Sequence, residues 1–146
     1  MRVHFRTAIL LAAAGLLAVA VDGWALGQPP YVAFTAANGS FPLVESNRAA
    51  TLWVDPADWP GVVRAVGDLQ ADVHRVTNLT PAIVHDGTHL PRAVVIIGTV
   101  GKSPIIDRLI REKKIDASGI AGKWESFFLQ TVSDPMPGVK NALVIA

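Results

Sequence analysis

The sequence predicts an α/β domain of the α+β sandwich-like kind, with a mixed sheet of about five to six short strands and two main helices. One observation is a fully apolar, β-branched run at residues 93–97, typical of a strand buried on both faces of a sheet. Another is the pair Ser103-Pro104, which favours a second helix start. The third is an apolar stripe at helical spacing, formed by Val62, Val66, Leu69, Val73 and Val76.

The first elements are short. Residues 26–48 read as an irregular lead-in rich in Gly and Pro, with at most a short strand at Tyr31–Phe34. Phe41–Val44 and Ala49–Val54 are strand-like, and the polar residues 45–48 between them suit a hairpin turn. The domain proper is therefore expected to be residues 49–146.

The apolar stripe has start and stop signals on both sides. Asp58 is expected to cap the helix, and Pro60 fits its first turn because the N–H it lacks would have no partner there. Asn78 is predicted to end the helix in a left-handed conformation, and Pro81 prevents its continuation.

The second half repeats the alternation of strand and helix. Ala82–Val84 and Ala93–Ile97 are predicted strands, followed by a turn at Gly98–Gly101 and the helix that Ser103 caps. The predicted buried face of that helix consists of Ile105, Ile106, Leu109 and Ile110. The remaining predictions are a strand at Glu125–Val132, a turn at Pro135–Gly138, and a strand at Ala142–Ala146, which we expect to continue into a longer protein.

Residues 1–25 resemble a secretory signal peptide. Arg2 and Arg6 precede the apolar run Ala8–Val21, which is too short to span a bilayer comfortably, and small residues fit cleavage after Ala20 or, preferably, Ala25. Cleavage would remove two of 13 basic and one of 12 acidic residues, leaving 11 of each. We therefore expect a secreted or periplasmic product with no membrane span after cleavage, and no nucleic-acid partner, because a polyanion binder needs a basic surplus.

Two segments superficially resemble ligand sites. Gly98–Ser103 ends in Gly-Lys-Ser between a strand and a helix, but only two residues separate its glycines where a phosphate-binding P-loop has four. It is predicted to be a plain turn, or a loop that contacts a neighbouring domain. His85 and His89 have a metal-like spacing only on a helix, which Gly87 and Pro91 disfavour, so no metal site is predicted.

In most glycoside hydrolases the catalytic groups are carboxylates. Asp55, Asp58 and Asp107 have structural explanations in a turn or at a helix start. Glu125 follows Trp124, and an aromatic plane beside an acid is a common sugar-binding arrangement. A core role for that tryptophan is nevertheless the favoured interpretation.

Several segments, taken in order, resemble the N-terminal region of glycoside hydrolase family 115, whose members are xylan α-1,2-glucuronidases. The resemblance covers most of residues 49–146 and none of the lead-in. Its segments are Asp68–Val73 with Arg75-Val76-Thr77 and Pro81, Ile97-Gly98-Thr99, Gly101-Lys102-Ser103 with Ile106-Asp107, Gly122–Glu125, Pro137-Gly138-Val139 and Ala142–Ile145. Two departures are Asn78 in place of Gly and Val100 in place of Leu.

The resemblance implies an accessory domain that precedes a (β/α)₈ barrel, in a protein that removes glucuronic acid or its 4-O-methyl form from xylan by inverting hydrolysis. The catalytic carboxylates of the family lie in the barrel, so no catalytic residue is expected in this chain, and neither a metal nor an organic cofactor is implied. The expected partners are the downstream barrel and a xylan-type polysaccharide. Candidate contacts with substrate or barrel are Gly98, Thr99, Lys102, Trp124 and Glu125.

Two alternatives remain. The first is a free-standing carbohydrate-binding domain with Trp53, Trp59 and Trp124 as stacking planes, which requires those rings to be exposed. The second is the N-terminal domain of another barrel glycosidase, such as a hexosaminidase.

Overall fold

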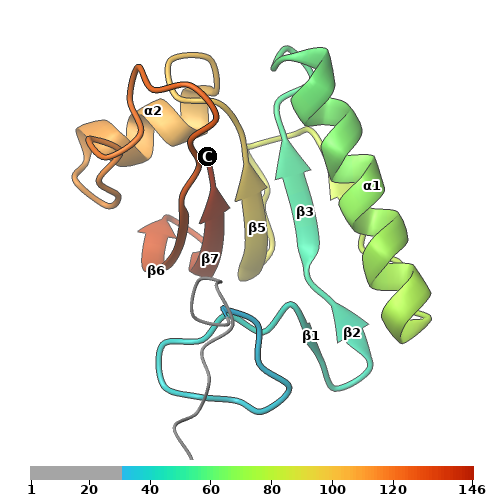
Figure 1. Ribbon diagram of the computed structural model, residues 1–146. Coiled ribbons are helices and arrows are strands. Elements are labelled where there is room, and N and C mark those ends of the chain that lie inside the picture. Colours follow the sequence, from blue (N-terminus) through green and yellow to red (C-terminus); the bar gives the residue numbers. More distant parts are fainter. Residues whose placement is uncertain (1–30) are drawn as a thin grey trace, which may run out of the picture. The chain divides into compact units, whose positions relative to one another are not determined.

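A computed structural model describes residues 31–146, and the predicted signal peptide lies outside this range. Residues 34–146 form one compact unit. Its elements, in chain order, are β1 (Val44–Glu45), β2 (Arg48–Ala49), β3 (Thr51–Val54), α1 (Pro60–Thr77), β4 (Ile83–Val84), β5 (Ala93–Ile97), α2 (Pro104–Arg111), β6 (Leu129–Met136) and β7 (Val139–Ile145) (Figure 1).

Five strands form one mixed sheet in the order β4-β3-β5-β7-β6. The strands β4, β3, β5 and β7 are parallel, whereas β6 pairs antiparallel with β7 at one edge. The predicted α/β class, with a mixed sheet and two helices, is confirmed. The remaining strands, β1 and β2, form a separate antiparallel hairpin.

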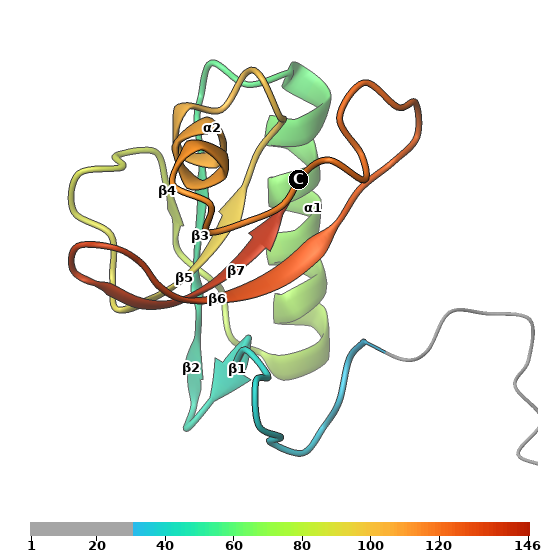
Figure 2. The same ribbon diagram turned by 90° about the vertical axis from the view of Figure 1, so that its left-hand side faces the viewer.

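The two helices lie on opposite faces of the sheet (Figure 2), and β5 contributes to both layers. Val94 and Ile96 pack with the buried side of α2, while Val95 and Ile97 pack with Val66 of α1. This alternation follows from the pleat of a strand, which sends successive side chains to opposite faces. The prediction of a central strand buried on both faces is therefore confirmed.

The face that carries α1 is covered over only half of its width. The helix contacts β3 and β4, and within residues 31–146 no helix lies over β6 and β7 on that side. Leu143 and Ile145 of β7 are half-buried there, and Leu129 of β6, which pairs with Ile145, is 37% exposed. An apolar strip thus remains open on the sheet.

The signals at the ends of the helices agree with the structure, with one exception. Asn78 ends α1 in the left-handed conformation at φ 59°, and Ser103 caps α2 through its hydroxyl, which accepts from the N–H of Ile106. Asp58, by contrast, does not cap α1, because Trp59 occupies the cap position without a side-chain hydrogen bond. Val76, expected in the apolar stripe, lies in the last turn of α1 and is 77% exposed.

Three strand boundaries differ from those predicted. Tyr31–Phe34 forms no strand. Phe41–Val44 contributes only Val44, and Ala49–Val54 divides at Ala50 because the N–H of Ala50 bonds to the carbonyl of Leu43 rather than to the main sheet. The predicted polar turn closes the hairpin through Ser46 and Asn47, both at positive φ, as a tight two-residue turn requires.

The last two strands also begin and end differently. The strand expected at Glu125–Val132 begins only at Leu129, because Glu125 has a φ of 51°, which is incompatible with extended pairing. The predicted turn at Pro135–Gly138 shortens to Pro137-Gly138. Pro135 remains inside β6, at an irregularity between Ser133 and Met136 where a missing N–H is tolerated.

Candidate functional site at the carboxyl edge of the sheet

Parallel pairing brings the loops that follow β3 and β5 to one edge of the sheet. The arrowheads of β3, β5 and β7 in Figure 1 point to the same side, so the segments after Val54 and Ile97 emerge together. Ligand sites of open α/β sheets lie beyond the carboxyl ends of strands. The Gly98–Lys102 loop, singled out from the sequence, is at this edge.

Asp58 joins the loops that follow β3 and β5. Its side chain is only 4% exposed, and its carboxylate accepts hydrogen bonds from the N–H of Thr99 at 2.8 Å and from the Thr99 hydroxyl at 2.7 Å. The N–H of Trp59 donates to the same carboxylate at 2.7 Å. A buried carboxylate requires such donors to offset its lost hydration. The interpretation of Asp58 as a helix cap was therefore wrong, and its partner is Thr99.

Gly98 is required by the tightness of this loop. A Cβ built on Gly98 would lie 2.6 Å from the Cβ of Ser103 and 3.2 Å from the Oδ2 of Asp58. No side chain fits in that space, because the backbone at Gly98 packs directly against Ser103 at the start of α2. The prediction of a plain strand-to-helix turn agrees with this packing.

Two backbone donors of this loop are occupied by the protein's own carboxylates. The N–H of Thr99 is bound by Asp58, and the N–H of Gly101 donates to Asp107 at 2.7 Å. A phosphate in a P-loop would occupy donors of this kind. The arrangement therefore favours a structural turn over an anion-binding loop.

Lys102 and Trp59 project from the two joined loops. The Nζ of Lys102 lies 4.6 Å from the centroid of the Trp59 ring, within the range of a cation–π contact. The ring remains 58% exposed. The sequence indicates Trp59 only as one of three candidate stacking planes. Its proximity to Lys102 depends on the pairing of β3 with β5, which brings the loops after these strands together.

Trp124 and Glu125 lie in the loop that leads into β6. Trp124 is 92% exposed, so the expectation that it belongs to the core is wrong. Glu125 is exposed, and the Ser126 hydroxyl donates to the carbonyl of Trp124 in the same turn. In residues 31–146 no hydrogen bond or ion pair joins this turn to the Gly98–Lys102 loop, so the five candidate residues form two separate groups.

The tryptophans divide between core and surface. Trp53 is 3% exposed and packs among the buried residues on the α2 side, which removes it as a stacking plane. Its indole N–H has no partner. Gly87 lies against it, because a Cβ at Gly87 would be 3.6 Å from that nitrogen. Trp59 and Trp124 remain the exposed tryptophans of the described chain.

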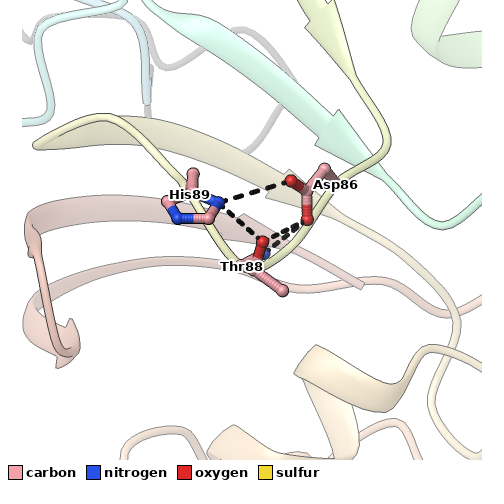
Figure 3. A network of polar contacts seen from close by, with 3 residues as sticks. All are labelled: Asp86, Thr88 and His89. Atoms are coloured by element: carbon pink, nitrogen blue, oxygen red, sulfur yellow. Dashed lines mark hydrogen bonds and ion pairs between the residues drawn. The ribbon is translucent and has the colours of Figure 1, made fainter.

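The histidine segment forms a surface network instead of a metal site (Figure 3). Asp86 accepts from the N–H and the hydroxyl of Thr88 at 2.8 and 2.7 Å, and His89 lies 3.6 Å from its other oxygen. The Thr88 hydroxyl, then its N–H, and then His89 lower the pKa of Asp86. His85 instead contacts the carbonyl of Val54 at 3.0 Å, and no group of three or more potential metal ligands occurs in the described residues.

A separate depression lies beside the β6–β7 hairpin. It measures about 470 Å³ and is open to solvent. Its lining includes Lys140, which is paired with Asp134 at 2.8 Å, and the further charged residues Arg92, Glu112 and Lys114. None of the five candidate contact residues Gly98, Thr99, Lys102, Trp124 and Glu125 lines it.

Neither family models nor curated proteins gave a match to this chain. Within residues 31–146, neither helix has the length and apolar character that would let it cross a membrane.

Proposed function

We propose that the chain is the N-terminal accessory domain of a secreted glycoside hydrolase that removes glucuronic acid or 4-O-methylglucuronic acid side chains from xylan by inverting hydrolysis. The chain itself is inactive in this proposal, and the catalytic acid and base belong to a barrel that follows it. The observation that carries the proposal is the ordered set of segments that resemble glycoside hydrolase family 115, above all Gly98–Ser103 with Asp107.

Two features of the fold support this assignment. The acids Asp58 and Asp107 bind backbone donors of the chain and are not free for acid–base chemistry. The half-covered sheet face with Leu129, Leu143 and Ile145 is apolar, as expected of a surface against which a further domain packs.

The experiment compares this chain with the product of the whole reading frame. Purified whole protein is expected to release glucuronic acid from glucuronoxylan, and proton NMR of the fresh product is expected to show the β-anomer that inversion of an α-linkage produces. The purified chain is expected to release none. Release by the chain alone, or none by the whole protein, would contradict the proposal.

A free-standing carbohydrate-binding domain is the second candidate. It is favoured by the exposure of Trp59 and Trp124, and weakened by the burial of Trp53. Binding of neutral xylo-oligosaccharides by the chain, lost together in Trp59→Ala and Trp124→Ala, would favour this function over the accessory domain.

A further inference from the structure

We infer that Trp59 and Lys102 together form a subsite for the ring and carboxylate of a uronic acid. This inference rests on the proposed function, which supplies the sugar class, and assigns that sugar a place on this domain. The two residues are called the Trp59–Lys102 platform below.

The platform is held in place before any ligand arrives. Asp58 fixes the loop after β3 to the loop after β5 through its two bonds to Thr99, and Trp59 is the next residue along the chain. On the other loop, the N–H of Lys102 donates to the carbonyl of Thr99 at 3.1 Å. Thr99 thus ties both members of the platform to one buried carboxylate, and a preformed site loses less entropy on binding.

The chemistry of the pair fits an anionic sugar. Trp59 is 58% exposed, and the part of its indole that the Lys102 ammonium does not cover offers an apolar surface to the C–H groups of a pyranose ring. The ammonium of Lys102, 4.6 Å from the ring centroid, offers a charge-assisted hydrogen bond to a carboxylate attached to that ring. Within residues 31–146 Lys102 forms no ion pair with a side-chain carboxylate.

The two contacts impose a specificity that either would lack alone. A neutral pyranose would use only the indole, and acetate would use only the ammonium. A uronate carries both groups on one ring and should bind more tightly than either probe.

The test is titration of the purified chain with glucuronate, glucose and acetate, followed by heteronuclear NMR of the tryptophan indole N–H signals. We expect glucuronate to shift the Trp59 signal with a Kd on the order of millimolar, and glucose and acetate to bind at least about fivefold more weakly. Salt should weaken the binding of glucuronate and not that of glucose.

Matched variants separate the platform from general surface effects. Lys102→Met, which retains most of the stem, should weaken glucuronate binding about tenfold, and Trp59→Ala should weaken it at least about fivefold. Lys123→Met and Phe127→Ala remove an exposed cation and an exposed aromatic ring elsewhere and should leave the Kd unchanged. Thermal melting of each variant shows whether it is folded.

Two results would overturn the inference: equal binding of glucuronate and glucose, or no Trp59 shift at saturating glucuronate with a folded chain. The outcome is separable from that of the proposed function. A whole protein that releases glucuronic acid, together with a chain that does not bind glucuronate, would remove the subsite and leave the proposed function intact.

Discussion

Asp58 and Thr99, 41 residues apart in sequence, are joined by two hydrogen bonds of 2.7 and 2.8 Å to one buried carboxylate. The pair connects the loops that follow the two adjacent strands β3 and β5, and thereby sets the position of both Trp59 and Lys102. The positions of these two loops at the carboxyl edge therefore depend on a carboxyl group that is almost fully buried.

Removal of this carboxylate should destabilise the domain. Asp58→Ala leaves the N–H of Thr99 without a partner in a region that water does not reach easily, so we expect a loss of about 3 kcal/mol in the free energy of unfolding. Thr99→Val removes only the hydroxyl bond and should cost about 1 kcal/mol. Urea denaturation of the purified variants measures both.

The control is Asp68→Ala, which removes an exposed carboxylate on α1 and should change stability by less than about 0.5 kcal/mol. In a double-mutant cycle, Asp58→Ala and Thr99→Val should be strongly non-additive, because they share one interaction. Additive effects would show that the two residues do not act together.

Replacement of two glycines by alanine should change the stability of the domain in opposite directions. Gly98→Ala places a Cβ 2.6 Å from the Cβ of Ser103, so the start of α2 must shift, at a cost of roughly 1–3 kcal/mol. Gly67→Ala, in the middle of α1, meets nothing within 4 Å and should stabilise the domain by about 1 kcal/mol through helix propensity. Melting temperatures should therefore move in opposite directions, and a shared direction would contradict the packing described around Gly98.

Features governed by local chemistry could be predicted from the sequence. Asn78 and Ser103 end and begin helices because their own side chains and backbone suit those positions. The burial of β5 followed from its unbroken apolar run. In each case the determining interaction lies within a few residues of the position concerned.

Features that depend on strand order could not be predicted in the same way. The partner of Asp58 is in a different strand-to-helix loop, and nothing in the sequence near Asp58 indicates it. The contact between Trp59 and Lys102 depends on the same pairing of β3 with β5. Trp124 was misassigned because an apolar ring usually indicates burial, whereas here a left-handed turn at Glu125 keeps the segment away from the sheet.

The ion pair of Asp134 and Lys140 predicts a small acid dependence of stability. The hydrogen bond from Lys140, and then its charge, lower the pKa of Asp134 below its usual value. A lowered carboxyl pKa contributes stability above the unfolded-state pKa of about 3.9, and this contribution is lost as the pH falls through the folded-state pKa.

NMR titration of the Asp134 carboxyl should therefore give a pKa below about 3.9 in the native chain, and a higher value in Lys140→Met. Lys123→Met, which removes an exposed lysine from another loop, should leave it unchanged. If Lys140→Met left the pKa of Asp134 unchanged, the ion pair would contribute nothing to the stability of the chain in solution. Both groups are exposed, so the effect on stability should be small and should decrease further with salt.

The last prediction concerns Glu125, the acid that the sequence places beside a tryptophan. Its backbone is left-handed at φ 51°, which costs a residue with a Cβ about 1 kcal/mol and costs glycine almost nothing. Glu125→Gly should thus stabilise the chain by up to about 1 kcal/mol, whereas Glu125→Gln should leave its stability unchanged, because the carboxylate accepts no hydrogen bond in the described structure. Under the proposed function, neither variant should reduce the release of glucuronic acid by the whole protein. A large loss of turnover in Glu125→Gln with unchanged melting would instead assign this carboxylate a role in the reaction.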